Sequence, residues 1–597
     1  MPSSECVRWL RWFAGRIGWW FESAFNGVVT GGPPVLRRCA REFLVNLDPT
    51  KLSTRWRRGL ALVLGIAFSF AFPRSSVAGL AWVIPGLLLI LTRTEPGKGA
   101  FQMGSIFGLG FALPSLYWMN FMPVTGFPVL GWVALSSYHA VYYGGWAWFA
   151  GWLLKRFDGD PCALTWIGRT IWAIQLSALW VAIEFTIGRF LTGFPWLQVG
   201  VTQFELVPLI QLASITGVGG LSFLVVWFSI SFALALEGMA RNPSSRAMAW
   251  REIFLPLSMV ALIFAWGTGR VREIDQAMER SAIPVRVATI QPSVPQTMIW
   301  DPAAETNRFN RLLELSREAL KDKPQLLLWP EAAMPGYLRH ERHISEQVIE
   351  LVREHEVWLV CNGNDARYAE GVGPPGRPDH FNTAFLVSPA GELVAQYDKQ
   401  HLVIFGEYVP LSEWLPLLKW FTPIEVGFKP GTEAVQFPVL NASVLICFED
   451  AFAHLARRAV TEKTRYLINL TNDGWFGRGP EQWQHAINSI FRSVETGRPL
   501  LRSANDGISC WIDPAGRVRD AFSDAGGSKI GLPRTGSVYA EGIQQFDVRL
   551  PLHNITTFYW KHGNWFVWGC FAVVGLSVMR GRLALAGGVQ PARVEPS

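Results

Sequence analysis

Long apolar runs fill about the first 270 residues of the chain and are separated by short charged or turn-forming stretches. Their lengths approach the ~20 apolar residues that a helix needs to cross a bilayer, so each run is expected to be a membrane helix. The expected spans lie at about 58–73, 76–92, 100–118, 128–154, 168–188, 207–236 and 253–268, with an eighth at 563–579. Only Pro73, Arg74 and Ser75 separate the first two spans, which predicts a helical hairpin.

Between about 270 and 560 the pattern changes to short β-rich runs that alternate with amphipathic helical ones. The clearest expected strands are Val285–Gln291, Gln325–Trp329, Ser443–Cys447 and Tyr466–Leu470, and the clearest helices are 302–320, 343–354 and 481–496. Such alternation predicts an α/β sandwich in which helices cover one face of a sheet. The chain is therefore expected to combine a multi-pass α-helical membrane domain with an α/β domain.

Composition supports a membrane protein. Half of the residues are apolar and only 17% are charged, against roughly 25% charged residues in soluble domains. The 29 tryptophans fit this class, because Trp favours the membrane–water interface. The net charge is +7, but most basic residues flank apolar runs, so we expect membrane lipid rather than nucleic acid as a partner.

The basic residues also predict the orientation of the chain. They lie at every second connection between spans: Arg55, Arg57, Arg58, Arg93, Lys98, Lys155, Arg156, Arg241, Arg246, Arg251, Arg580 and Arg582. Because cytoplasmic loops carry the excess of Lys and Arg, both termini are expected in the cytoplasm. The long segment between spans seven and eight then lies outside the cytoplasm.

These patterns divide the chain into five expected parts. They are a basic N-terminal arm at 1–57, a membrane domain of about seven helices at 58–268, an extracytoplasmic α/β domain at 269–560, a C-terminal transmembrane helix at 561–580 and a cytoplasmic tail at 581–597. The arm fits an interfacial amphipathic helix and a cytoplasmic tail equally well.

The seven cysteines include no CxxC pair, and no Cys/His group has zinc spacing. Neither a structural metal nor a disulfide framework is indicated. Glu481 and His485 share one expected helix, where a satisfied helix face is a better interpretation than a pair of metal ligands. We expect no metal and no cofactor.

Four polar residues follow expected strands in an order that carries chemistry. Cys447 follows the apolar run Val444–Ile446, although a lone cysteine is more often a small core residue. Glu331, Lys399 and Glu407 each follow an earlier strand or hairpin. Because a free thiol is mostly protonated at neutral pH, Glu331 is suited to accept its proton and Lys399 to stabilise an oxyanion, with Glu407 positioning them.

In order and spacing, Glu331, Lys399 and Cys447 resemble the Glu–Lys–Cys triad of the nitrilase, or carbon–nitrogen hydrolase, superfamily. That resemblance implies a nitrilase-like αββα sandwich. Eight spans with such a domain between the last two resemble the apolipoprotein N-acyltransferase family. Stretches that carry the resemblance include Thr192–Leu197, Gln211–Ser214, His401–Val403, Phe405–Pro410, Thr471–Gly477, Glu495–Pro499 and Asn505–Ser509.

The resemblance implies an activity. Cys447 would take a fatty acyl chain from a phospholipid, expected to be phosphatidylethanolamine, and form a thioester. The N-terminal amine of a diacylglyceryl-cysteine on an apolipoprotein would then accept the chain, in ping-pong fashion. This family works in the bacterial inner membrane, which places the catalytic domain on the periplasmic side.

The resemblance also implies supporting residues near the site, namely Glu407, Phe448, Glu449, Trp475 and Trp196. Three positions depart from the family pattern, with Phe448 where Tyr is common, Ile404 where Pro is common and Asn564 where Asp is usual. Independently of the family, the apolar segment Leu411–Phe428, which includes Trp414 and Trp420, predicts either an arm resting on the membrane or a helix packed on the domain core.

Two other functions fit parts of the pattern. A membrane-tethered amidase or nitrilase would share the triad, but would have no use for the apolar segment. A transporter or scaffold with an inactive outer domain is disfavoured, because the triad is complete and the spans contain few charges. Glu184 and Arg189, near the outer end of the fifth span, either pair to support the site or are simply interfacial, and the first is favoured because charges at membrane depth tend to be functional.

Overall fold

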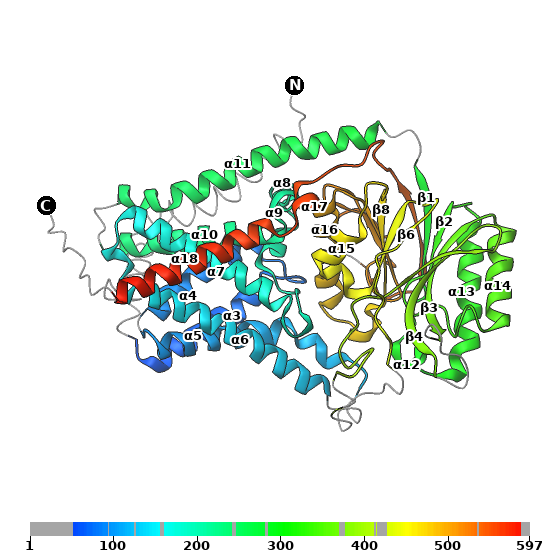
Figure 1. Cartoon of the computed structure of the whole chain (residues 1–597), viewed down its shortest axis with the longest axis horizontal. Coiled ribbons are helices and arrows are strands. Elements are labelled where there is room, and N and C mark those ends of the chain that lie inside the picture. The colour runs from blue at the N-terminus through cyan, green and yellow to red at the C-terminus, as the bar shows by residue number, and fades with distance from the viewer. Residues whose placement is uncertain are drawn as a thin grey trace.

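The computed structural model describes residues 52–93, 95–124, 127–155, 160–241, 246–280, 284–368, 377–410, 414, 427–533 and 536–586. A bundle of helices and a two-sheet sandwich lie end to end (Figure 1). Most of the expected N-terminal arm and of the apolar segment Leu411–Phe428 falls outside the described residues, as do 587–597.

Each expected span contains a helix of the bundle. These helices are α3 (Thr54–Ser69), α4 (Ile84–Thr92), α5 (Lys98–Ser115), α6 (Phe127–Leu153), α7 (Trp166–Ile187), α10 (Val218–Arg241), α11 (Arg246–Glu279) and α18 (Trp565–Ala586). Among the described residues, α7, α10 and the part of α11 from Trp250 are long and apolar enough to cross a membrane. The chain is accordingly a membrane protein.

Two expected spans are interrupted. The span at 76–92 divides into the 3₁₀ helix η3 (Ala78–Trp82) and the nine-residue α4, which at 1.5 Å per residue is about half as long as the ~30 Å bilayer core. The span at 207–236 divides into α8 (Val207–Ile210), α9 (Ala213–Thr216) and α10. Gly217 separates α9 from α10 with a φ of +70°. An apolar run indicates that its residues are buried but does not show where a helix is interrupted, so the sequence pattern missed both breaks.

Two other helices are longer than expected. The seventh span was expected to end at 268, but α11 has 34 residues and continues to Glu279. It thereby extends from the bundle alongside the sandwich (Figure 1). The last helix continues to Ala586, beyond the expected boundary at 580. Charged residues after the apolar run do not interrupt a helix, which explains both differences.

Small residues allow the bundle helices to pack closely, as expected in lipid. A Cβ atom added to Gly86 of α4 would lie 2.1 Å from the carbonyl oxygen of Ser229 in α10. One added to Gly104 of α5 would lie 2.5 Å from the carbonyl oxygen of Tyr143 in α6. Any larger residue at these glycines would therefore separate the helices.

The sandwich contains two mixed sheets. The first has the order β13-β1-β2-β3-β4-β5 and the second the order β12-β11-β10-β9-β8-β7-β6. The strands of the first are β1 (Val285–Gln291), β2 (Leu326–Leu328), β3 (Trp358–Arg367), β4 (Asp379–Val387), β5 (Leu393–Asp398) and β13 (Gly542–Val548). Those of the second are β6 (Gln436–Phe437), β7 (Ala442–Ile446), β8 (Tyr466–Thr471), β9 (Leu500–Ala504), β10 (Cys510–Ile512), β11 (Val518–Ala521) and β12 (Ser528–Ile530). Strands β1, β2 and β3 run parallel, as do β7, β8 and β9.

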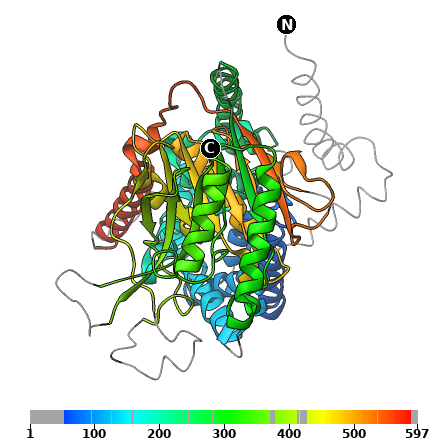
Figure 2. The same cartoon turned by 90° about the vertical axis from the view of Figure 1, so that its right-hand side faces the viewer.

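Helices cover the outer face of each sheet. In the first sheet, Leu327 packs with α13 (Glu305–Leu320) and α14 (Arg342–Glu354), while Leu326 and Leu328 pack between the sheets. Figure 2 shows α13 and α14 in front of the sheets. The second sheet is covered by α15 (Ala453–Ala459) and α16 (Glu481–Thr496). This layering confirms the αββα sandwich.

Helix α16 also contacts the bundle, and it does so through buried hydrogen bonds. The Gln484 side-chain oxygen accepts the indole N–H groups of Trp118 and Trp196 at 3.1 and 2.8 Å. The backbone N–H of Val218 donates to Glu495 at 3.0 Å. Helix α16 therefore lies between the second sheet and the bundle and is hydrogen-bonded to the bundle.

Candidate active site

Cys447 lies at a sharp turn between β7 and the short helix η12 (Cys447–Ala451). Its φ is +55°, a left-handed conformation that costs a non-glycine residue roughly 1–3 kcal/mol. The Asn469 side-chain amide donates to the Cys447 carbonyl at 2.8 Å and so supports this turn. The thiol residue is thereby presented at the carboxyl edge of the sheet, with only 8% of its surface exposed.

Lys399, at the end of β5, joins the two predicted acids. Its ammonium donates to Glu331 at 3.1 Å and to Glu407 at 2.9 Å, and all three side chains are buried. Two of the three ammonium protons are used in this way, which leaves one for another acceptor. The structure therefore brings Glu331, Lys399 and Glu407 together as the sequence predicts.

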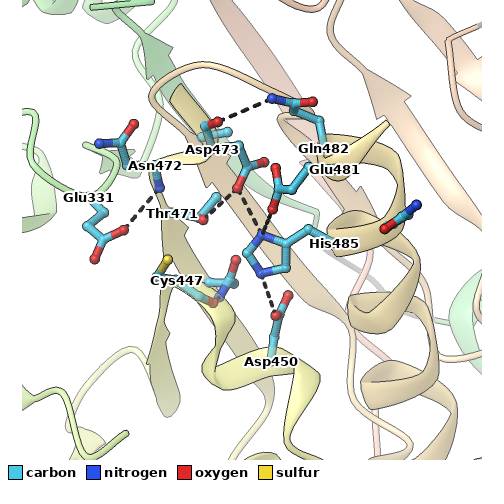
Figure 3. A network of polar contacts seen from close by, with 12 residues as sticks. Glu331, Cys447, Asp450, Thr471, Asn472, Asp473, Glu481, Gln482 and His485 are labelled. Atoms are coloured by element: carbon cyan, nitrogen blue, oxygen red, sulfur yellow. Dashed lines mark hydrogen bonds and ion pairs between the residues drawn. The ribbon is translucent and has the colours of Figure 1, made fainter. Parts of the chain in front are cut away.

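Backbone and amide groups orient the two acids. The Asn382 amide in β4 donates to Glu331 at 3.0 Å and to Glu407 at 2.9 Å. The other oxygen of Glu331 accepts the backbone N–H of Asn472 at 3.1 Å, and that of Glu407 accepts the N–H of Val403 at 2.8 Å. Figure 3 shows Glu331, Asn472 and the Cys447 thiol on one side of the network.

The charges around Cys447 are unbalanced, with two carboxylates against one ammonium. Burial raises the pKa of the Cys447 thiol well above its ordinary value, and Glu331 and Glu407 add to this although Lys399 opposes it. For Lys399, burial lowers the pKa, but the two carboxylates outweigh it and the pKa lies well above its ordinary value. The resting site thus contains a neutral thiol and a permanent ammonium.

Glu449 is fully buried and holds the Cys447 turn to the end of β5. It accepts hydrogen bonds from the Tyr397 hydroxyl at 2.9 Å, from the backbone N–H groups of Gln400 and His401 at 2.7 and 3.0 Å, and from that of Ile446 at 2.8 Å. Burial raises the pKa of Glu449 to about 7, against these hydrogen bonds. Its oxygens are occupied by donors, so its position fits a supporting residue.

The other predicted aromatic residues lie in different places. Phe448 packs edge-on against His401, and its ring centre is 5.9 Å from the Lys399 ammonium. Trp475 packs against Trp300 with ring centres 5.1 Å apart. The Trp414 side chain is 83% exposed, and Trp420 falls outside the described residues.

Trp196 leads from the bundle to a second buried network. Its ring centre lies 5.2 Å from that of His485 in α16. The imidazole is placed between two carboxylates, with Nε2 2.8 Å from Asp450 and Nδ1 2.8 Å from Asp473 (Figure 3). Arg502 in β9 donates to the same two acids at 3.1 and 2.8 Å.

The groups around His485 could also be considered as metal ligands, since one ligand atom each from Asp473, Glu481 and His485 lie within 4.8 Å of one another. However, both imidazole nitrogens already face carboxylates, and the Arg502 guanidinium contacts Asp473. Burial by itself lowers the pKa of His485, yet Asp450 and Asp473 raise it to about 10 although Arg502 opposes them. The arrangement therefore fits an imidazolium between two acids.

An open cleft lies where the bundle meets α15 and α16, and its lining includes Glu184, Arg189, Phe452 and His454. Glu184 accepts the N–H groups of Trp180 and Val199 at 2.9 and 2.7 Å. Among the described residues no ion pair joins it to Arg189, so the expected pairing of these two residues is not observed. Phe452 lines the cleft, and the centre of its ring is 5.3 Å from that of Phe448, the residue after Cys447.

Sequence reasoning missed several residues of the site. Asn382 sits within a strand without a motif, and its role depends on two acids from other segments. Asp450 adjoins the cysteine motif and Asp473 lies in the Thr471–Gly477 stretch, but the pattern gave no sign that one histidine joins them. Arg502 lies in an apolar strand and is fully buried. An arginine within an apolar run, where arginine is rare, was the only sign of its role that the sequence offered.

The sandwich and its site define the class of protein, and residues 286–526 match the carbon-nitrogen hydrolase family. Residues 64–231 match the apolipoprotein N-acyltransferase N-terminal domain. The chain is 32% identical over 525 residues to the apolipoprotein N-acyltransferase of Geobacter metallireducens, covering 86% of this chain and 93% of that protein. It is 31% identical over 499 residues to that of Bradyrhizobium diazoefficiens, covering 78% and 87%. The chain belongs to the apolipoprotein N-acyltransferase family, which is a family of enzymes.

Among solved structures, an amidase from Nesterenkonia sp. aligns with 49% of this chain and 97% of its own, at 18% identity and a TM-score of 0.33. That similarity is too low to add to the family assignment.

Proposed function

We propose that the protein transfers a fatty acyl chain from a phospholipid to the N-terminal amine of a diacylglyceryl-cysteine on an apolipoprotein. The observation that carries the proposal is the placement of a Lys399 ammonium between Glu331 and Glu407, beside a buried thiol, on a chain anchored by a helical bundle. Phosphatidylethanolamine is the proposed donor.

In the first step, Cys447 attacks the ester carbonyl of the phospholipid. Because its thiol is neutral at rest, Glu331 takes the proton as the sulfur–carbon bond forms. The remaining Lys399 proton donates to the oxyanion. When the ester bond breaks, Glu331 returns the proton to the leaving oxygen, and a lysophospholipid departs from a thioester enzyme.

In the second step, the acceptor amine attacks the thioester carbonyl, and Glu331 accepts an amine proton. Collapse of this intermediate forms the amide and releases the Cys447 sulfur, which regains the proton. Glu407 and Asn382 support the proposal by fixing the Lys399 and Glu331 positions in both steps. Because burial raises the pKa of the Cys447 thiol, the reactive thiolate forms only while the acyl chain is being transferred.

The proposed location is the inner membrane, with the sandwich in the periplasm and both termini in the cytoplasm. Ion pairs support this orientation, because they gather at the ends of bundle helices that carry the basic connections. Arg93 pairs with Glu237, Arg57 contacts Glu95 at 3.2 Å, and Arg241 contacts Asp160 at 2.6 Å. In Figure 1 helix α18 runs from the sandwich side of the bundle to the end opposite the sandwich.

Mass spectrometry of the purified full-length protein tests the chemistry. After incubation with phosphatidylethanolamine vesicles, one fatty-acyl mass increment is expected on Cys447, and hydroxylamine should remove it. Cys361→Ala is the matched control, because Cys361 is another buried cysteine of the sandwich whose pKa burial raises to about 12. An adduct that persists in Cys447→Ala would refute the assignment of the nucleophile.

A further inference from the structure

His485 occupies a position that the acyl-transfer steps do not use, yet it connects the two loops that do. Its Nε2 side faces Asp450, three residues after Cys447 in the same short helix. Its Nδ1 side faces Asp473, the residue after Asn472, whose backbone N–H donates to Glu331. One ring thus links the turn that carries the thiol to the loop that orients the proposed base.

The contacts require a doubly protonated ring. Both nitrogens lie 2.8 Å from a carboxylate oxygen, so each must donate a hydrogen bond. The charged groups that face the ring are Asp450 from η12, Asp473 after β8, Glu481 from the same helix and Arg502 from β9. Burial raises the pKa of Glu481 well above its ordinary value, and the negative charge of Asp473 raises it further. Asp450 and Asp473 together match the charges of one imidazolium and one guanidinium.

The ring is also the point where the bundle contacts this network. Trp196 packs on its face, and the neighbouring Gln484 accepts the N–H groups of Trp118 and Trp196. The Gln484 amide in turn donates to the carbonyl oxygen of Pro73 at 3.1 Å. The position of His485 is therefore determined by membrane helices as well as by the sandwich.

We propose that His485 is a positioning residue for acyl transfer, an imidazolium whose bridge between Asp450 and Asp473 keeps the Cys447 thiol and the Glu331 carboxylate in register. This inference rests on the proposed function. A loss of register of about 1 Å between reacting groups lowers a rate by about 10²-fold. Removal of the bridge should accordingly slow the chemical step and leave phospholipid binding unchanged.

The test compares full-length His485→Gln with wild type and with Ser489→Ala in phosphatidylethanolamine vesicles. Ser489 donates to Asp450 and accepts from Arg502 at 3.4 Å, so its removal takes two hydrogen bonds from the network but leaves the bridge. The measurements are the rate of thioester formation, its KM for phospholipid, and the number of acyl groups formed per protein. His485→Gln should form one acyl group per protein about 10²-fold more slowly, with KM unchanged within about twofold. Ser489→Ala should remain within about threefold of the wild-type rate.

Three results would overturn the proposal. One is a wild-type rate in His485→Gln. Another is that fewer His485→Gln molecules are acylated but at the wild-type rate, because this would indicate that some of the protein is misfolded rather than that the reacting groups are out of register. The third is a stoichiometric divalent metal in the purified wild type that His485→Gln lacks, because His485 would then be a ligand. A wild-type enzyme that forms no acyl adduct would overturn the proposed function together with this inference.

If His485→Gln does not accumulate as folded protein, Asp450→Asn replaces it. Asparagine retains the shape of the side chain and an acceptor oxygen for Nε2, but it removes one of the two charges that hold the imidazolium. A full acyl stoichiometry with a rate about tenfold lower would support the positioning role. A wild-type rate in this variant would overturn it.

Discussion

Two buried charge networks adjoin the Cys447 turn, and they differ in their balance. Around Lys399, two carboxylates face one ammonium, and the ammonium has a proton without a protein acceptor among the described residues. Around His485, the acids Asp450 and Asp473 face two cations. The unbalanced network keeps a thiol neutral and leaves a donor available, whereas the balanced one fixes the positions of its members. Chemistry and rigidity thus come from opposite charge balances in two neighbouring networks.

The largest effect is expected from removing the proton acceptor of the unbalanced network. Glu331→Gln preserves the shape of the side chain but cannot take the Cys447 proton, so the rate of thioester formation should fall about 10²–10⁴-fold. Stopped reactions analysed by intact-protein mass spectrometry measure this rate. If Glu331→Gln reacted at the wild-type rate while Glu407→Gln did not, Glu407 rather than Glu331 would be the acceptor of the Cys447 proton.

Removing the Asn382 amide, which donates to both acids, should lower the rate less than Glu331→Gln does and should also lower the stability of the protein. Asn382→Leu removes one buried donor from each of Glu331 and Glu407, and such a loss costs about 1–3 kcal/mol. The melting temperature should fall, and the rate should fall because Glu331 keeps only its hydrogen bonds from Lys399 and the Asn472 N–H. Asn382→Asp is the contrasting variant, because it adds a third negative charge and should lower activity further. Equal activities of these two variants would show that charge balance is unimportant here.

The balanced network predicts a pH dependence of stability. The folded pKa of His485, about 10, lies above its ordinary 6.5, so the stabilisation is complete below pH 6.5 and is lost as pH rises through 10. In this window wild type should lose up to about 1.4 kcal/mol per pH unit relative to His485→Gln. Melting temperatures of both proteins from pH 6 to pH 10 measure the difference. Parallel curves would contradict an imidazolium at this position.

The smallest effect is expected outside both networks, at the departure from the family pattern. Phe448→Tyr adds a hydroxyl to a half-buried ring that packs on His401 and Phe452. Because the ring contacts are retained, the change in stability should stay within about 0.5 kcal/mol. Acyl-transfer rates with donors of different head groups measure any change in preference. A loss of thioester formation would place Phe448 among the residues that the chemistry requires.

Much of the architecture follows from the sequence because it depends on local pattern. The extents of β1 and α16 agree with the expected ranges, since alternation and helical periodicity report burial directly. The breaks at Val83 and Gly217 were not predicted, because the apolar runs continue across both, although Pro85 and Gly217 are residues that disfavour a helix interior. Packing against other helices decided where these runs bend.

For the site, the sequence by itself determined which residues supply the thiol, the acids and the ammonium. Each follows a strand, and the order Glu331, Lys399, Cys447 resembles one superfamily. Only the tertiary structure decided that one ammonium is shared by Glu331 and Glu407 through the same amide, and that His485 lies between Asp450 and Asp473. Hydrogen bonds and charge balance between distant segments depend on distances of a few ångströms, and linear spacing carries no information about those distances.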